Sequence, residues 1–156
     1  MKKILTVLVL MAISLYTYSQ SGEKSLLLKA GYQTDYKRFG LGVEGRYGLP
    51  YNFRLAPDLT VFFPKDHVTG LDANVNVHYV APIQGGLSLY PLAGLGIVNN
   101  RYSNDGHSHG NTDIAFNLGF GAEYALDGRG YLNGEFKYMF SDMDSAVFMF
   151  GYGLRF

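Results

Sequence analysis

Hydrophobic and polar residues alternate with a period of two from Lys24 to the C-terminus, in runs separated by Gly, Pro, Asn and Asp. Each run is long enough to cross a bilayer as a tilted β-strand, which takes about 9–11 residues. The pattern predicts an all-β chain of eight antiparallel strands. The predicted strands cover residues 24–34, 38–47, 52–63, 70–80, 87–98, 113–125, 130–140 and 145–156.

The two faces of each predicted strand differ in chemistry. In the run 70–80, Leu71 and Val75 share one face, whereas Asp72 and Asn76 share the other. Because successive side chains of a strand point to opposite sides, one face suits lipid or a core and the other suits water or polar partners.

Alternation alone does not separate a membrane barrel from a soluble β-sandwich or a lipocalin-like barrel. Two observations favour the membrane. Leaving the large apolar side chains in water would forgo roughly 1.5–3 kcal/mol each relative to burial. Glycines also recur on the polar face, where a narrow barrel lumen needs small residues beside large ones but a water-exposed face does not. These glycines are Gly40, Gly42, Gly94, Gly96, Gly119, Gly121, Gly151 and Gly153.

We therefore expect an eight-stranded antiparallel up-and-down transmembrane β-barrel. It must be closed, because an open sheet edge in hydrocarbon would leave backbone groups unsatisfied. A periplasmic or secreted β-barrel or sandwich is the alternative.

Residues 1–20 have the order of a secretory signal peptide. Lys2 and Lys3 precede an apolar run from Ile4 to Leu15, and small and polar residues follow. The run is too short for a transmembrane helix, which needs about 20 apolar residues. We expect residues 1–20 to be cleaved on export and residues 21–156 to form a barrel domain in the bacterial outer membrane.

Composition narrows the chemistry. The chain has no cysteine, which excludes a disulfide framework, a lipidated N-terminal cysteine and a thiolate metal site. Loss of Lys2 and Lys3 with the signal peptide would reduce 13 Lys and Arg to 11 against 13 Asp and Glu, a net charge of −2. This balance indicates no nucleic-acid partner. We expect a monomer that needs no cofactor.

The connections between the predicted strands differ in length between the two ends. Connections 48–51, 81–86 and 126–129 are short, as periplasmic turns of outer-membrane barrels are. The opposite connections are 35–37, 64–69, 99–112 and 141–144, and the longest of them, NNRYSNDGHSHGNT, is predicted to be an external loop.

Two prolines fit poorly inside predicted strands. Pro57 and Pro91 each remove a donor from the hydrogen-bond ladder, so we expect either β-bulges at these positions or strand boundaries that differ from the predicted ones.

The whole predicted barrel resembles the small eight-stranded outer-membrane barrels of the OmpA and OmpX type. The C-terminal MFGYGLRF looks like the terminal strand signal of such proteins, with Gly151, Leu154 and Phe156 at its glycine, apolar and aromatic positions. Met149 departs from it, because the signal usually has a polar residue there. The resemblance implies outer-membrane lipid and the barrel-assembly machinery as partners. Alternatively, Phe156 is only another lipid-facing aromatic residue.

Charged residues of both signs fall on the polar face. Charges in so narrow an interior must be paired to offset desolvation, so we expect a salt-bridge network that closes the lumen. A gated ion path is the alternative, and glycoside hydrolysis by paired carboxylates is discounted because the lumen leaves no room for a sugar. The residues concerned are Lys29, Glu44, Arg46, Arg54, Asp58, Asp72, Glu123, Glu135, Lys137 and Arg155.

His107 and His109 in GHSHG lie near Asp105 and Asp113 and carry atoms that suit a divalent metal. Structural zinc sites need four fixed ligands, and nothing in the sequence holds this segment in place. The pattern favours a solvated loop, with the two histidines as weak metal candidates and no metal site assigned.

The segment NNRYSNDG resembles the histidine-x-serine-asparagine segment of outer-membrane lipid A deacylases. Arg101 stands where that family has its histidine, which leaves Ser103 without an adjacent general base unless His107 of the same loop replaces it. We therefore predict no enzyme and no catalytic residue. The preferred function is a structural or surface-interaction role through the external loops. A small pore or transport protein is the alternative, and a lipid-modifying enzyme is a distant third.

Overall fold

The computed structural model describes residues 22–65, 68–104, 107–142 and 144–156, with the side chains of 64, 65, 102–104 and 107–109 also outside the description. A short β5 (Ala81–Pro82) and a 3-10 turn (Pro50–Asn52) lie in the connections. The eight long strands are β1 (Lys24–Gln33), β2 (Arg38–Gly48), β3 (Phe53–Lys65), β4 (Val68–Tyr79), β6 (Leu87–Asn104), β7 (His107–Ala125), β8 (Gly130–Phe140) and β9 (Ser145–Arg155).

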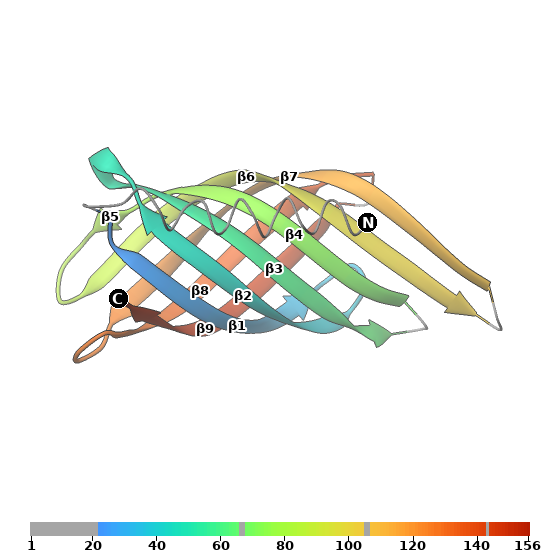
Figure 1. Cartoon of the computed structure of the whole chain (residues 1–156), viewed down its shortest axis with the longest axis horizontal. Coiled ribbons are helices and arrows are strands. Elements are labelled where there is room, and N and C mark those ends of the chain that lie inside the picture. Colours follow the sequence, from blue (N-terminus) through green and yellow to red (C-terminus); the bar gives the residue numbers. More distant parts are fainter. Residues whose placement is uncertain (1–21, 66–67, 105–106, 143) are drawn as a thin grey trace.

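The long strands form a closed ring. Each pairs antiparallel with its neighbours in the order β4-β3-β2-β1-β9-β8-β7-β6, and the pairing of β4 with β6 joins the two ends of the sheet (Figure 1). The predicted closed, eight-stranded antiparallel up-and-down β-barrel is therefore confirmed. Closure pairs β4 with β6, so the sheet has no open edge at that seam, as hydrocarbon requires.

The strands are strongly staggered around the ring. A path of paired residues that leaves Tyr90 on β6 through Gly121 on β7 returns to β6 at Asn100, ten residues further along. In a barrel of eight strands, such a stagger goes with tilted strands and with an interior that side chains fill.

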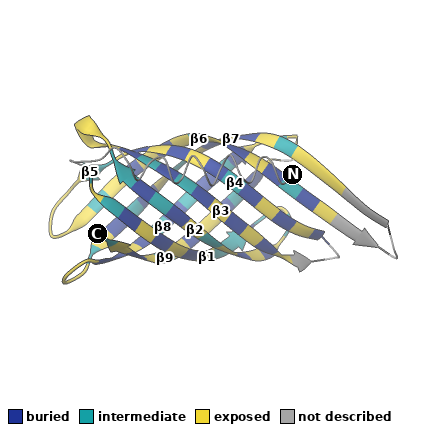
Figure 2. Ribbon diagram, in the orientation of Figure 1, coloured by how far each residue is buried: buried dark blue, intermediate teal, exposed yellow. Residues whose placement is uncertain are grey.

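Burial follows the predicted alternation. Figure 2 shows buried and exposed residues alternating along the strands. Large apolar side chains such as Leu28, Phe120 and Phe150 are exposed on the outside by 64%, 64% and 70%, which suits contact with lipid. The inward parity is buried and mostly polar. Among the described residues, no helix is long and apolar enough to span a membrane.

The predicted boundaries were wrong at two external connections. Where the connection 64–69 was predicted, β3 continues to Lys65 and β4 begins at Val68. Residues 99–112 do not form a loop either, because β6 continues to Asn104 and β7 begins at His107. The ladder runs from Asn99 opposite Thr112 to Asn104 opposite His107. Beyond the membrane neither face is required to be apolar, so the segment forms a hairpin without the alternation that marks the other strands.

The β-bulges expected at the two prolines are absent. Pro57 lies opposite Val75 in an uninterrupted ladder with β4, and only the ladder with β2 skips its position without a change of register. Pro91 lies opposite Phe120, and pairing between β4 and β6 ends at Leu92. Each proline therefore removes a donor where the ladder on one side is already interrupted. Among the described strand pairs, the one register shift lies elsewhere, between Phe62 and Lys65.

Candidate functional site

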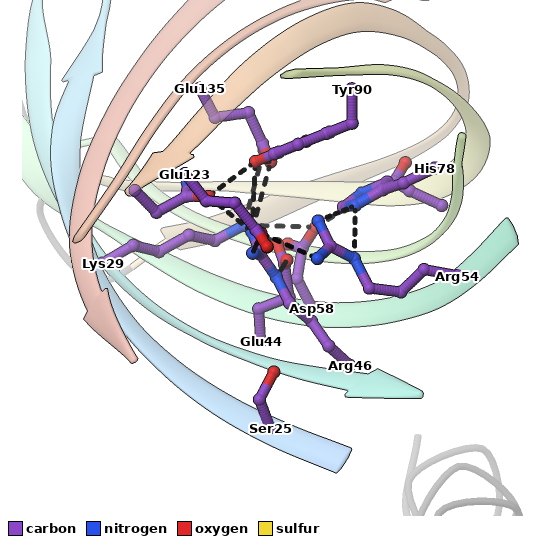
Figure 3. Close-up of polar contacts among 12 residues, drawn as sticks. Ser25, Lys29, Glu44, Arg46, Arg54, Asp58, His78, Tyr90, Glu123 and Glu135 are labelled. Atoms are coloured by element: carbon purple, nitrogen blue, oxygen red, sulfur yellow. Dashed lines mark hydrogen bonds and ion pairs between the residues drawn. The ribbon is translucent and has the colours of Figure 1, made fainter. Parts of the chain in front are cut away.

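The charged side chains of the inward face meet in the middle of the barrel (Figure 3). Lys29 on β1 places its Nζ 2.7 Å from Oε2 of Glu44, 3.5 Å from Oδ2 of Asp58 and 3.8 Å from Oε1 of Glu135. These carboxylates come from β2, β3 and β8. One buried ammonium group thus joins four strands.

A second group lies around Glu123 on β7. Oε2 of Glu123 is 2.8 Å from Nη1 of Arg46 and 2.7 Å from Nη1 of Arg54. Arg46 also donates through Nε to Glu44 Oε1, which connects this group to that of Lys29. Arg155, near the C-terminus, extends it with contacts of 3.2 Å to Glu123 and 2.6 Å to Glu23.

Asp58 is the third centre of this cluster. Its Oδ2 lies 3.3 Å from Nζ of Lys137, and its two oxygens accept hydrogen bonds from Asn74 and Asn76 at 2.9 and 3.0 Å. These contacts supply the multiple donors that a buried carboxylate needs to offset its desolvation.

The structure brings nine of the ten charged residues named as the lumen network into ion pairs. They are Lys29, Glu44, Arg46, Arg54, Asp58, Glu123, Glu135, Lys137 and Arg155.

Asp72 is the exception. It is 1% exposed, its Oδ1 has no hydrogen-bond partner, and within the described residues no ion pair reaches its carboxylate. It lies in the lumen without joining the cluster.

The sequence did not single out the uncharged members of the cluster. Tyr90 places its hydroxyl 2.9 Å from Glu135 Oε2 and 2.8 Å from Asn133 Oδ1, and its ring stacks on His78 at 4.5 Å. A Cβ on Gly121, the residue opposite Tyr90, would overlap the tyrosine ring. A glycine on the polar parity therefore signals a large inward side chain on a neighbouring strand.

Glu44, His78 and Glu135 offer ligand atoms within 4.8 Å of one another, as a metal site would. The contacts of these atoms favour another interpretation. Both oxygens of Glu44 are held by Lys29 and Arg46. Arg54 donates to Nδ1 of His78 at 3.0 Å, which leaves Nε2 as the protonated nitrogen of a neutral imidazole, without a lone pair for a metal. The ammonium of Lys29 already supplies the positive charge.

The weak metal candidates His107 and His109 lie on β7 with their backbone opposite Asn104 and Tyr102. Their side chains, like that of Ser103, lie outside the described part of the chain. The metal and enzyme hypotheses for this segment therefore stay untested.

The predicted assembly signal occupies the end of β9. Gly151 lies between Lys29 and Asn133 in the sheet. Leu154 and Phe156 are 50% and 61% exposed, and the backbone N–H of Phe156 donates to the carbonyl of Lys24 at 2.9 Å. Recognition of these residues by the barrel-assembly machinery stays a prediction.

Comparison with known proteins identifies one family. Residues 5–156 match the sequence profile of the outer membrane protein beta-barrel domain. No protein of curated function matches the sequence significantly.

Three solved structures share the fold at low identity. The N-terminal β-barrel domain of Pseudomonas aeruginosa OprF is 18% identical, with a TM-score of 0.76 over 87% of this chain and 100% of that chain. Yersinia pestis Ail, in complex with the heparin analogue sucrose octasulfate, is 20% identical, with a TM-score of 0.66 over 88% and 100%. Neisserial surface protein A is 16% identical, with a TM-score of 0.63 over 86% and 94%.

Proposed function

The chain belongs to the outer membrane protein β-barrel domain family, and from this premise we propose that it contacts partners outside the cell through its β6–β7 hairpin, on a barrel whose lumen is closed. Its location in the bacterial outer membrane follows from the family, and the membrane lipid surrounds the apolar outer face. Cleavage of a signal peptide at residues 1–20 remains a prediction, since these residues lie outside the described chain.

The orientation of the barrel supports an external position for the hairpin. In outer-membrane barrels short turns and both termini face the periplasm. Here the connections 49–52, 80–86 and 126–129 lie at the same end as the C-terminus (Figure 1). The β6–β7 hairpin projects beyond the other strands at the opposite end.

The observation that carries the proposal is the free edge of β7. Its ladder with β8 begins only at Phe116, so residues 107–115 pair with β6 alone among the described strands. A strand edge with unpaired N–H and C=O groups is a template for an added strand. The partner that fits this edge is an extended segment of another protein.

An anionic sugar fits the hairpin less well. Ail was solved with a sulfated heparin analogue, but residues 99–112 of this chain contain a single Lys or Arg, Arg101, beside one acid, Asp105. A sulfated polysaccharide needs a cluster of cations. This composition favours strand addition over sugar binding.

Deletion of residues 103–110 tests the proposal. It removes the tip of the hairpin and leaves Asn100 opposite Asn111 as the last pair below the new turn. We expect attachment of expressing cells to polystyrene, and their aggregation in suspension, to fall to the level of cells without the protein. A Gly-Ser segment of equal length that replaces 103–110 is the control for loop length. Unchanged attachment and aggregation, with the barrel still present at the surface, would contradict the proposal.

The two other functions have less support. A pore needs a continuous wet path, whereas the side chains of Lys29, Glu44 and Asp58 are at most 1% exposed, and both carboxylates are paired with the Lys29 ammonium. The family and the similar structures are outer-membrane barrels rather than enzymes, and we propose no catalytic residue and no cofactor for this chain. We also propose that it acts as a monomer.

The proposed assembly signal gives a separate prediction. Phe156→Ala should lower the amount of barrel assembled in the membrane more than Phe116→Ala, although both side chains face outward, with exposures of 61% and 46%. Burial alone predicts similar losses, so a difference marks recognition. The heat-modifiable band of membrane fractions on an SDS gel measures assembly. Equal amounts for both variants would leave Phe156 as an ordinary lipid-facing residue.

A further inference from the structure

The outer part of the lumen contains an apolar layer that the polar parity of the strands did not predict. Six buried side chains from β3, β6, β7, β8 and β9 form one hydrophobic cluster, and each is at most 7% exposed. Most lie within a few residues of the strand ends that face outward. The six residues are Phe62, Val98, Ala115, Met139, Val147 and Met149.

Glycines on the remaining strands let this layer fill the lumen. A Cβ on Gly40 would come within 2.6 Å of the Phe62 ring, and one on Gly31 would overlap the sulfur of Met149. The large apolar side chains therefore occupy the space that side chains of β1 and β2 would otherwise take.

Arg38 lies on the outer side of the layer. It is 2% exposed, and its guanidinium lies 4.9 Å from the centroid of the Phe62 ring. Its Nε donates to Gln33 at 2.7 Å and its Nη2 donates to Asn100 at 2.8 Å. The guanidinium thus ties β1, β2 and β6 together above the apolar side chains.

The charged cluster borders the layer on its inner side. Lys137, which contacts Asp58, is two residues before Met139 on β8 and opposite Val147, and Glu135 is opposite Met149. Two buried polar side chains also lie beside the layer, Asp72 opposite Val98 and Gln33 opposite Val147. A hydrophobic constriction stops ions because it does not hold their hydration water.

We propose that this apolar layer is a permeability barrier of its own, in series with the charged cluster, so that disruption of the cluster alone does not open the barrel. The inference deepens the closed lumen of the proposed function and rests on it. It assigns to the six residues a role that neither the family nor their alternation implies.

Planar-bilayer conductance of the purified full-length protein tests the series arrangement. The charged cluster is disrupted by Glu135→Ala with Lys137→Ala, which removes one charge of each sign. The apolar layer is disrupted by Met139→Ser with Met149→Ser. We expect the wild type and each double variant to be silent and the quadruple variant to conduct steadily.

A matched control keeps the layer apolar. Met139→Leu with Met149→Leu, combined with the two alanine changes, should remain silent. A compact species on an unheated SDS gel must accompany every recording, so that leakage from unfolded protein is not scored.

The outcomes separate the two proposals. Steady conductance of the wild type would overturn the closed lumen itself. A silent wild type with conductance from Glu135→Ala and Lys137→Ala alone would overturn only the independent barrier. Silence of the folded quadruple variant would also overturn it, because another part of the lumen would then be the seal.

Discussion

Glu44→Gln should lower the free energy of unfolding by about 3–5 kcal/mol, the cost of removing one partner from a buried ion pair. The side chain is fully buried, and its carboxylate holds both Lys29 and Arg46. The amide keeps the volume but loses the negative charge, which leaves two buried cations with less compensation.

Asp72→Asn is the matched control. Asp72 is as deeply buried and changes by the same replacement of carboxylate with amide, but no ion pair reaches it among the described residues. The change removes an unpaired buried charge, so stability should stay the same or rise. The fraction of protein in the compact band on unheated SDS gels, followed across a urea series, measures the stability of both variants. Equal losses would show that burial, not pairing, sets the cost, and would contradict the network.

The strands and their facing were predictable because lipid and lumen impose opposite requirements on alternate residues. Leu71 and Asp72 are neighbours in sequence, and the structure exposes one and buries the other. Prediction failed where that requirement ends. The extension of β6 and β7 through residues 99–112 lies beyond the apolar band and has no alternation to mark it.

The members of the lumen cluster were predictable, but their partners were not. Parity alone places Lys29, Glu44 and Asp58 inside the barrel. Whether Lys29 meets Glu44 or Asp72 depends on the stagger between strands, which is a property of the closed ring. The stagger of ten residues between Tyr90 and Asn100 emerges only when all eight pairings are followed.

The apolar layer escaped prediction for a related reason. Met139 and Met149 share the parity of charged residues, and as single inward apolar side chains they carry no signal. They form a hydrophobic cluster only together with buried apolar residues of other strands. Sequence alone does not define which of these residues meet, because that too depends on the stagger.

Glycine positions offer a second sharp test of the packed lumen. Gly31→Ala should destabilise the barrel by about 1–3 kcal/mol or more, as overpacking of a filled core does. A Cβ there would overlap the carbonyl oxygen of Phe148 as well as the sulfur of Met149. A side chain can turn aside, but the Phe148 carbonyl belongs to the strand that pairs with β1. Relief therefore requires movement of β9 against β1.

Gly45→Ala makes the same chemical change on the outer face of β2. The nearest atom to its Cβ would be Pro57 Cγ at 3.9 Å, an ordinary contact. Replacing a strand glycine with alanine also reduces the freedom of the unfolded chain, so this variant should be neutral or stabilised by about 0.4–1 kcal/mol. The urea concentration at which half of the compact gel species is lost is compared between the two glycine variants. If Gly31→Ala shifted the midpoint no more than Gly45→Ala, the lumen would have room for another side chain. The outer half of the barrel would then not be filled by its side chains, which would contradict the proposed closure.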